Sequence, residues 1–443
     1  MAAKDKAAET LKRLLEGEPK SPSFSPVRFT TGCTLLDLVI GGGQGMGMKG
    51  GTLLNFVAVE GGGKTQLTAE SIAHNYHAKK DQGFWHKFID REHRFSFDTE
   101  SMWGVTVCDR SEWVPDTVEE LDGYMSKLLN DAKAPGMIVV DSLDAFSTEE
   151  TEIRSDKRMK QVDAGKDIKQ DGSYTVTTGT PKFLSESLRI TMSKAMQSQT
   201  AVILLSQVRS KLNAMQFDPS KFNRNGGKAL DHWCDTIGWL RPLRFFGVGS
   251  EKDGTYRDTG AVVKFWTTKS STPRPFRECI YTILFDYGID NIGSNIDFLF
   301  NLRDPKTGAL RDPNDTSKEE SFKDTTKPIF ICWEPGAEKT LEAVVEWLGT
   351  MGGESAKDQE ARAARKVEAG HTRLSLEWLD TWIAKDPELQ AAYVAKFPTY
   401  TRDQLIRAVE ADKDMEAELT RRTIEKWEAV EAAAASNRRS KFA

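Results

Sequence analysis

Short apolar runs alternate with longer stretches of helical periodicity between about residues 28 and 290. The runs that predict strands are LLNFVAV (53–59), KFID (87–90), GMIVVDS (136–142), AVILLSQ (201–207), TIGWLRPL (236–243) and AVVKFW (261–266). Residues 65–80 and 181–198 have the spacing of helices. Strands that are apolar throughout are typical of a sheet covered on both faces, so the pattern predicts an α/β architecture.

The two ends of the chain differ in pattern from its centre. Residues 1–27 predict a helix within AETLKRLLEG, followed by a linker rich in proline and serine. A tethered helix cannot bury its leucine face alone, so it docks either onto a neighbouring subunit or onto its own core. Residues 303–328 predict an exposed polar loop, and LSLEWLDTWIAK, DQLIRAVEA and TIEKWEAVEAA predict helices beyond it. We expect four parts: residues 1–27, a core at 28–300, a connecting segment at 301–354, and a helical domain with its tail at 355–443.

Composition narrows the class of protein. Of 443 residues, 39% are hydrophobic and 29% charged, which is typical of a globular protein, and the net charge of −5 excludes a DNA-coating protein that is basic overall. A local basic surface is still allowed. No apolar run approaches the roughly 20 residues that span a bilayer, and the N-terminus lacks the apolar stretch of a signal peptide. We therefore expect a cytoplasmic protein without a membrane partner, and its five scattered cysteines are expected to be reduced thiols.

The strongest local motif is a glycine-rich turn between the strand LLNFVAV and the helix that follows it. Successive glycines let the main chain curl so that its N–H groups point at phosphate oxygens, and the helix N-terminus adds a favourable dipole. A lysine at this place reaches the β- and γ-phosphates of a nucleoside triphosphate, and a threonine hydroxyl ligates Mg²⁺. The motif predicts that ATP and Mg²⁺ are bound by Val59, Glu60, Gly61, Gly62, Gly63, Lys64, Thr65 and Gln66.

One position departs from the P-loop pattern GxxxxGK[ST], because Ala58 stands where the pattern has its first glycine. Alanine adopts a positive φ only at a cost, so either the turn differs slightly or the phosphate affinity is altered. A glycine-rich turn without a ligand is the alternative interpretation, which the flanking strand and the run Gly63-Lys64-Thr65 disfavour.

Two carboxylates follow apolar strands downstream of this motif. Asp141 ends the strand GMIVVD, which places it at the carboxyl edge of the sheet, where ligands of open α/β sheets bind. We expect it to hold Mg²⁺ through water. Glu92 lies just past the strand KFID, and we expect it to orient or deprotonate an attacking water. A surface carboxylate in a charged turn is the alternative interpretation for Glu92.

Taken together, these segments resemble the bacterial RecA recombinase family, including its phage-encoded members. The resemblance covers roughly residues 28–290. It is carried by TGCTLLD (31–37), GMGMKGGTLLNFVAVEGGGKT (45–65), FIDREH (88–93), IVVDSLDAF (138–146), LLSQVR (204–209), GGKAL (226–230) and PF (275–276). It implies a RecA-like P-loop NTPase core with a mostly parallel central sheet, an N-terminal oligomerisation helix and a small helical C-terminal domain.

The resemblance also implies roles for single residues. Glu92 matches the catalytic glutamate of the family, and Gln207 matches the glutamine that senses the γ-phosphate. Lys269 matches one of two lysines that reach the γ-phosphate from the neighbouring subunit. Together with Lys64, these are the expected catalytic residues.

Other positions depart from the family. The second of the two lysines is replaced by Ser271, unless a short insertion brings Arg274 into that role. Thr99 stands where the family has the tyrosine that stacks on adenine, and Phe95 or Phe97 could substitute for it. The family's Lys–Phe pair that links subunits and its strongly acidic C-terminus are both missing from this sequence.

The segment from Arg209 to about Gly227 matches the second DNA-binding loop of the family. Its cations and aromatic rings suit single-stranded DNA, because cations meet phosphates and rings stack on bases. A flexible surface loop is the alternative interpretation. The first DNA-binding loop, at 148–181, is longer than is usual in the family, which leaves its contacts open. The expected DNA-binding residues are Lys182, Arg209, Lys211, Phe217, Lys221, Arg224, Gly226 and Gly227.

The resemblance implies an ATP-dependent DNA recombinase, which hydrolyses ATP in response to DNA. Such a protein forms helical filaments on single-stranded DNA and exchanges it with a homologous duplex. Its partners would be both kinds of DNA and further copies of the same chain. One alternative is a RecA-fold ring helicase or motor ATPase. The other is a regulatory relative that binds DNA or a recombinase but hydrolyses little ATP.

Overall fold

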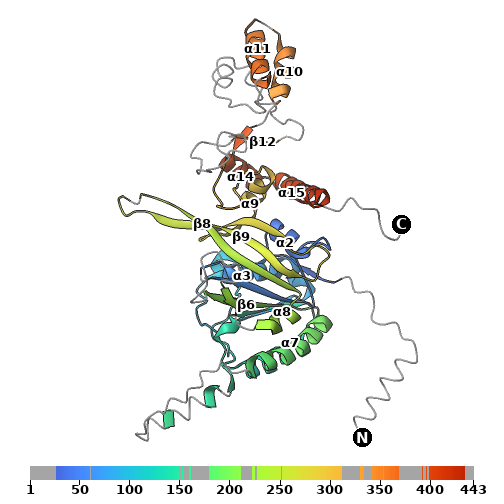
Figure 1. Ribbon diagram of the computed structural model, residues 1–443, viewed down its shortest axis with the longest axis vertical. Helices are drawn as coiled ribbons and strands as arrows, with labels where there is room; N and C mark the ends of the chain where they lie inside the picture. Colours follow the sequence, from blue (N-terminus) through green and yellow to red (C-terminus); the bar gives the residue numbers. More distant parts are fainter. Residues whose placement is uncertain are drawn as a thin grey trace, which may run out of the picture.

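A single large sheet lies at the centre of the protein, with helices on both of its faces (Figure 1). The computed structural model describes residues 26–59, 61–149, 151–153, 159–160, 179–210, 222–224, 227–250, 252–311, 330–333, 341–352, 354–368, 392, 396 and 399–434. The strands of the sheet are β3 (Leu53–Ala58), β4 (Trp85–Asp90), β5 (Gly136–Asp141), β6 (Ala201–Ser210), β7 (Phe222–Arg224), β8 (Thr236–Val248), β9 (Arg257–Ser270), β10 (Glu278–Leu284) and β11 (Gly288–Asp290).

Five neighbouring strands of this sheet are parallel. The strand order is β11-β10-β9-β8-β3-β6-β5-β4, and β7 pairs with β6 outside this path. Strands β8, β3, β6, β5 and β4 pair in parallel, whereas β9, β10 and β11 extend the sheet as an antiparallel meander. The expected α/β core with a mostly parallel sheet is therefore confirmed. The sequence pattern did not predict β10, β11 or the full length of the β8–β9 hairpin, which projects past the rest of the sheet (Figure 1).

Alternate residues of β3 face opposite layers of helices. The helices are α2 (Thr34–Gly41), α3 (Lys64–Lys79), α4 (Thr99–Trp103), α5 (Val118–Asp131), α7 (Gly179–Ser198), α8 (Gly227–Trp233) and α9 (Asn291–Leu299), with short turns η1 (Lys80–Gln82) and η2 (Leu143–Ala145). Leu54 and Phe56 belong to a core cluster with α2 and α3, while Leu53 and Val57 belong to a second cluster with α5, α7 and α8. Burial on both sides explains why the central strands are apolar throughout.

Helix α5 shows how the sequence sets the ends and the buried face of a helix. Its N-cap Thr117 accepts a hydrogen bond from the main-chain N–H of Glu120 at 3.2 Å, and the Glu120 carboxylate accepts one from the N–H of Thr117. This reciprocal pair is a capping box. Leu121, Met125 and Leu129 recur every four residues, so they share one face and reach the same core cluster.

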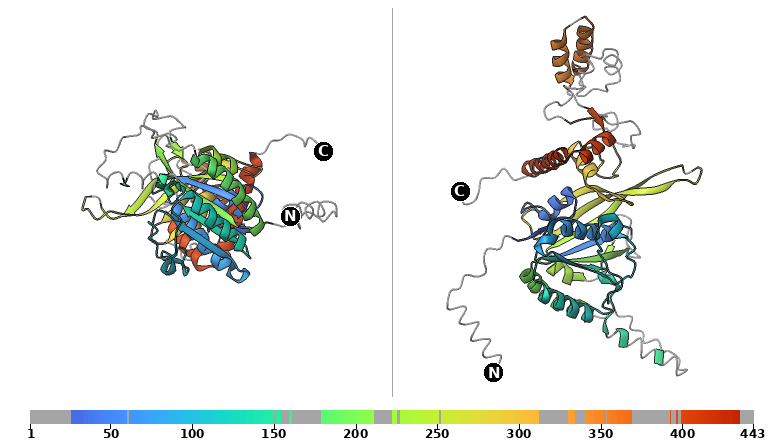
Figure 2. Two further views of the ribbon diagram at one scale, coloured as in Figure 1. Left: turned by 90° about the horizontal axis from the view of Figure 1, so that it is seen from below. Right: turned by 180° about the vertical axis from the view of Figure 1, so that it is seen from behind.

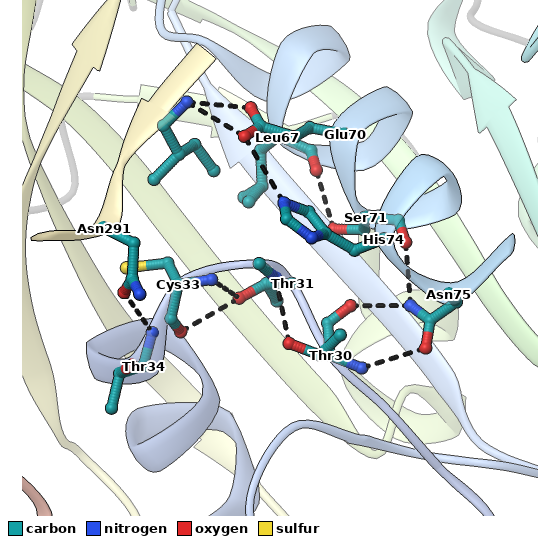
Figure 3. Close-up of polar contacts among 12 residues, drawn as sticks. Thr30, Thr31, Cys33, Thr34, Leu67, Glu70, Ser71, His74, Asn75 and Asn291 are labelled. Atoms are coloured by element: carbon teal, nitrogen blue, oxygen red, sulfur yellow. Dashed lines mark hydrogen bonds and ion pairs between the residues drawn. The ribbon is translucent and has the colours of Figure 1, made fainter. Parts of the chain in front are cut away.

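Helix α3 is fixed to its neighbours by buried polar contacts (Figure 3). Asn75 Nδ2 donates to the carbonyl oxygen of Thr30 at 2.7 Å, and Thr30 N donates to Asn75 Oδ1 at 3.2 Å. The buried carboxylate of Glu70 accepts the N–H of Ile289 at 2.9 Å, which ties the helix to β11. These contacts hold α3, and with it the glycine-rich turn at its N-terminus, in a set position against the sheet.

In the C-terminal region, the last two helices pack back onto the core. This region comprises β12 (Phe330–Cys332), α10 (Leu341–Met351), α11 (Glu354–Glu368), β13 (Thr399–Thr401), α14 (Arg402–Ala411) and α15 (Lys413–Ala433), while β1 (Arg28–Phe29) and β2 (Met48–Lys49) form a small pair near the N-terminus. Ile296, Leu405 and Leu419 share one apolar cluster, and Trp427 of α15 joins the main core cluster. Figure 2 shows the same packing from behind, with α14 and α15 in red over one end of the core. Helices predicted at 403–411 and 423–433 are confirmed; those at 8–17 and 374–385 lie outside the described residues.

A buried ion-pair network joins α9 to α14. Asp297, which is 4% exposed, accepts hydrogen bonds from Arg402 Nε at 2.6 Å and from Arg303 Nε at 2.7 Å. Burial alone would raise the pKa of Asp297, but the two guanidinium groups hold it below its ordinary value. The carboxylate is therefore a charged link between the core and the C-terminal region.

In the part of the chain that the structure describes, no helix has both the length and the apolar character needed to cross a membrane. Cys33, Cys108, Cys234 and Cys279 are free thiols, as their scattered spacing predicts.

Candidate nucleotide site

The turn between β3 and α3 (residues 59–65, here called the phosphate loop) depends on each of its three glycines. Gly61 has a φ of 70° and Gly63 a φ of 82°, which lie in the left-handed region that glycine adopts without strain. A Cβ atom on Gly62 would lie 2.6 Å from the Cβ of Ala58 and 3.0 Å from the carbonyl oxygen of Val59. Two glycines are therefore required by conformation and the third by space.

The conformation of Ala58 explains why the P-loop pattern tolerates alanine at this position. It is the last residue of β3 and does not adopt a positive φ, so alanine carries no conformational penalty there. Its methyl group is buried directly beside Gly62. The turn thus accepts alanine at the first position of the pattern, provided that residue 62 is glycine.

The first two residues of α3 connect the loop to the rest of the site. Lys64 Nζ donates to the carbonyl oxygens of Ala58 at 3.3 Å and of Val59 at 3.4 Å, so the ammonium group lies over the loop. Thr65 Oγ1 donates to Asp141 Oδ2 at 2.6 Å. The two side chains expected to hold Mg²⁺ are therefore in direct contact, close enough to share one ion.

The electrostatic setting of Asp141 suits a divalent cation. Burial raises the pKa of Asp141 to about 6; the hydrogen bond from Thr65 and the charge of Lys64 oppose the rise, and the carboxylates of Glu92 and Asp90 add to it. A Mg²⁺ ion at this point would offset the gathered negative charge. Among the residues described, no three His, Cys, Asp or Glu side chains form a metal cage.

Glu92 is held beside Asp141 by a residue that the sequence analysis did not single out. Asp90 and Asp141 are register partners at the ends of β4 and β5, and Arg91 N donates to the carbonyl oxygen of Asp141 at 2.8 Å. Ser142 Oγ donates to Glu92 Oε1 at 2.5 Å. The expected water-activating carboxylate and the expected metal ligand are therefore adjacent. Ser142 lies within the segment IVVDSLDAF, but a serine after a strand carries no signal of its own.

Gln207 lies on β6 beside the end of β3. Its register partner is Ala58, and its N–H donates to Asp144 Oδ2 at 2.6 Å, a contact that the sequence did not reveal. Further along, β6 pairs with β7, where Arg209 lies opposite Asn223. One strand thus runs from the phosphate loop to the start of the expected second DNA-binding loop.

Lys269 lies at the opposite end of the sheet from the phosphate loop. It pairs with Ile237, which in turn pairs with Asn55 near the start of β3, whereas the loop follows the end of that strand. Lys269 Nζ donates to the carbonyl oxygens of Asp231 at 2.6 Å and His232 at 2.8 Å, at the end of α8. Within one chain Lys269 does not join the other catalytic candidates, as a lysine that acts on a neighbouring subunit would not.

The two candidates for the second lysine position differ in their surroundings. Ser271 Oγ donates to the carbonyl oxygen of Asp235 at 3.2 Å and is too short to reach beyond it. Arg274 Nη1 lies 3.2 Å from Glu431 Oε2, which belongs to helix α15.

The structure narrows the choice of an adenine-stacking residue. The Thr99 hydroxyl is buried and accepts the N–H of Val107 at 3.1 Å, so it faces the interior. Phe95 is 4% exposed and packs on Phe88 with their ring centroids 4.9 Å apart. Phe95 is therefore a core residue and was wrongly considered for stacking, which leaves Phe97 as the half-buried candidate.

Several expected contact residues are not described in full. Those outside the described residues are Glu60, Lys211, Phe217, Lys221 and Gly226. The main chain alone is described for Lys182, Arg209, Arg224 and Gly227, which lie in α7, β6, β7 and α8. The side chain of Gln66 is buried, and its Nε2 atom has no hydrogen-bond partner among the described residues.

A phosphate loop of this geometry, at the carboxyl edge of a mostly parallel sheet, defines a P-loop nucleotide-binding protein. Comparison with known families is more specific. The model of the RecA N-terminal domain matches residues 25–290, which is more than half of the chain, and the chain belongs to the RecA family.

Relatives named Protein RecA match about three-fifths of the chain at low identity. The protein of Aquifex pyrophilus is 30% identical over 272 residues, covering 61% of this chain and 69% of the relative. That of Sulfurovum sp. (strain NBC37-1) is 27% identical over 290 residues, covering 65% and 73%. A solved structure, the crystal structure of the RadB recombinase, matches 59% of this chain and 98% of its own at 17% identity and a TM-score of 0.38. The family match ends at β11, so α14 and α15 lie beyond it.

Proposed function

We propose that this protein is an ATP-dependent DNA recombinase, which assembles into helical filaments on single-stranded DNA and exchanges that strand with a homologous duplex. The observation that carries the proposal is the convergence of Thr65, Asp141 and Glu92 beside the strand that bears Gln207. Membership of the RecA family and the relatives named Protein RecA support the same activity.

In the proposed ATP hydrolysis, different residues of one site bind the phosphates, hold the cation and activate the water. The N–H groups of the phosphate loop and the ammonium group of Lys64 bind the phosphates, and Thr65 and Asp141 hold the cation. Bound Mg²⁺ would neutralise charge on the β- and γ-phosphate oxygens. Glu92, kept in place by Ser142, orients the attacking water and accepts its proton.

Strand β6 provides the proposed link between the nucleotide and DNA. A γ-phosphate contact at Gln207 acts on the same strand that carries Arg209 and pairs with β7, and residues 211–221 lie between β6 and β7 in the sequence. A bound triphosphate would favour one arrangement of this loop, and hydrolysis would remove that preference. We place the DNA contacts at Lys182, Arg209, Lys211, Phe217, Lys221, Arg224, Gly226 and Gly227.

The proposed activity also depends on assembly. Lys269, remote from its own phosphate loop, would stabilise the transition-state charge on the nucleotide of the next subunit. In this arrangement residues 1–27 dock between subunits and residues 28–300 bind ATP and DNA. Residues 301–354 connect this core to the helical domain at 355–443.

An ATP hydrolysis assay with and without single-stranded DNA, read beside electron microscopy, tests the proposal. We expect hydrolysis to rise on addition of DNA and helical filaments to form with ATP. Lys64→Ala should lower the stimulated rate at least about a hundredfold, because a preorganised cation at the phosphates is removed. Lys80→Ala, an exposed lysine at the far end of α3, is the matched control and should leave the rate unchanged.

Other outcomes would contradict the proposal. Closed rings in place of filaments would favour a motor ATPase of the same fold. Nucleotide binding without turnover, with or without DNA, would favour a regulatory relative.

A further inference from the structure

Helix α15 contacts the turn between β9 and β10 (residues 271–277, here called the β9–β10 turn) through the carboxylate of Glu431. Glu431 Oε1 accepts from Arg277 Nε at 2.8 Å, and Glu431 Oε2 accepts from Arg277 Nη2 at 2.8 Å. The same Oε2 atom lies 3.2 Å from Arg274 Nη1. A residue of the C-terminal helix, beyond the region that the family model matches, thus contacts the middle and the last residue of the turn.

Of the two contacts of Glu431, the one with Arg277 is the more deeply buried. The Arg277 side chain is 6% exposed, and its main chain exchanges hydrogen bonds with Thr267 at the end of the β9–β10 ladder. A guanidinium group buried to this extent needs a compensating charge, and the bidentate geometry suits a carboxylate. Hydrogen bonding to Arg277 also lowers the pKa of Glu431, so the carboxylate stays ionised near neutral pH.

A second contact fixes the turn from its other side. Gly42, which follows α2, has a φ of 59°, and a Cβ atom built on it would lie 1.9 Å from Thr272 Oγ1. The absence of a side chain at Gly42 therefore lets the loop after α2 close directly on the turn. The β9–β10 turn is confined between this loop and α15.

What the confined turn exposes is a cation and an aromatic ring. The Arg274 side chain is 49% exposed, and Phe276 is 74% exposed with a φ of 64°. Both follow Lys269 closely, at the end of the sheet opposite the phosphate loop. These groups cannot meet the nucleotide of their own chain, but they are presented outward, where another copy of the chain can be met.

We propose that Glu431 is a positioning residue, which sets the β9–β10 turn so that its exposed groups engage the next subunit and allow assembly-dependent ATP hydrolysis. The inference rests on the proposed function and assigns the C-terminal helix a part in it. Glu431 acts through Arg277 and Arg274 and touches no nucleotide itself. Loss of the Glu431 carboxylate therefore weakens the contact between subunits and the positioning of Lys269 at the nucleotide of the next subunit. The phosphate loop stays intact.

Glu431→Gln is the informative variant, with Glu428→Gln as the matched control on an exposed part of the same helix. Nucleotide-dependent self-association is followed by analytical ultracentrifugation, and the DNA-stimulated hydrolysis rate is measured over a range of protein concentrations. For Glu431→Gln we expect the concentration that gives half-maximal assembly to rise roughly tenfold, because a buried charge loses its partner. Binding of an ATP analogue to the unassembled protein should change less than about twofold, and Glu428→Gln should match the unaltered protein in all three measurements.

Mixed assemblies separate positioning from general damage to the fold. Lys64→Ala subunits keep an intact β9–β10 turn, and Glu431→Gln subunits keep an intact phosphate loop, so the mixture should hydrolyse ATP faster than the sum of the two alone. If Glu431→Gln does not fold, Arg274→Gln replaces it in the same experiments, because Arg274 is the half-exposed partner of Glu431. The inference is overturned if Glu431→Gln assembles at the same concentration as the unaltered protein, or if the mixture hydrolyses ATP no faster than the sum of the two variants. Either result leaves DNA-stimulated hydrolysis by the unaltered protein unaffected. Loss of that stimulation in the unaltered protein overturns the proposed function instead.

Discussion

Gly62 of the phosphate loop tests whether space, and not only conformation, constrains this site. In Gly62→Ala the new methyl group would lie 2.6 Å from the Cβ of Ala58 and 3.0 Å from the carbonyl oxygen of Val59. Neither atom can swing aside, because one belongs to the main chain and the other is bonded directly to it. Overpacking of this kind costs about 1–3 kcal/mol, and we expect the free energy of unfolding to fall by an amount in that range. Displacement of the loop should also weaken ATP binding roughly tenfold or more, because each 1.4 kcal/mol is a factor of ten.

Two further variants separate the causes. Ala58→Gly removes the methyl group that the new side chain meets, so the double variant should recover part of the loss, with a coupling free energy of about 1 kcal/mol or more. Gly61→Ala is the control. Gly61 has a φ of 70° but no atom within 4 Å of its Cβ position, so the alanine variant should lose only roughly 1–2 kcal/mol of stability to left-handed backbone strain. It should show no coupling to Ala58→Gly.

Urea unfolding followed by tryptophan fluorescence supplies the free energies of unfolding, and titration with a fluorescent ATP analogue in Mg²⁺ supplies the affinities. The reasoning is refuted if Gly62→Ala and Ala58→Gly are additive within about 0.5 kcal/mol. In that case the contact between the two Cβ atoms would not be what excludes a side chain from position 62.

Three other predictions address the packing and the metal. Asp297→Asn should lower the free energy of unfolding by about 3–5 kcal/mol, because Arg402 and Arg303 lose the buried charge that they share and Arg402 keeps only its longer contact with Asp290; a loss under 1 kcal/mol in urea unfolding would contradict this. Asp37 of α2 is 4% exposed and accepts a hydrogen bond from the N–H of Thr31 at 2.7 Å. Burial raises its pKa from 3.8 to about 6, so its contribution to stability is full below pH 3.8 and is lost as pH rises through 6. Between pH 4 and pH 7 the difference in unfolding free energy between Asp37→Asn and the unaltered protein should change by about 2 kcal/mol, and parallel curves would contradict this. Thr65→Val should abolish the Mg²⁺ dependence of nucleotide affinity, which a titration at varied Mg²⁺ measures; an unchanged dependence would remove Thr65 from the metal site.

The sequence by itself was sufficient for the parts of the protein that depend on local patterns. Apolar runs located the strands β3, β4, β5, β6, β8 and β9, because strands that pack against other elements on both faces are rich in apolar residues. The phosphate loop was recognisable because three glycines, a lysine and a threonine must be consecutive for the main chain to curl into a helix N-terminus. Asp141 and Glu92 were found because parallel strands bring their carboxyl ends to one edge.

Only the tertiary structure decided which polar groups meet. Ser142 and Glu92 are 50 residues apart, Asp144 and Gln207 63, and Glu431 and Arg277 154. No spacing within a segment encodes such pairs, because they depend on the order of strands in the sheet and on how the C-terminal helices return to the core. The same holds for Phe95, which the sequence allowed as a ring that stacks on adenine but which fills the core beside Phe88. Apolar periodicity reports which face of an element is buried, whereas a hydrogen bond also needs a direction and a partner, and these exist only once the elements are packed.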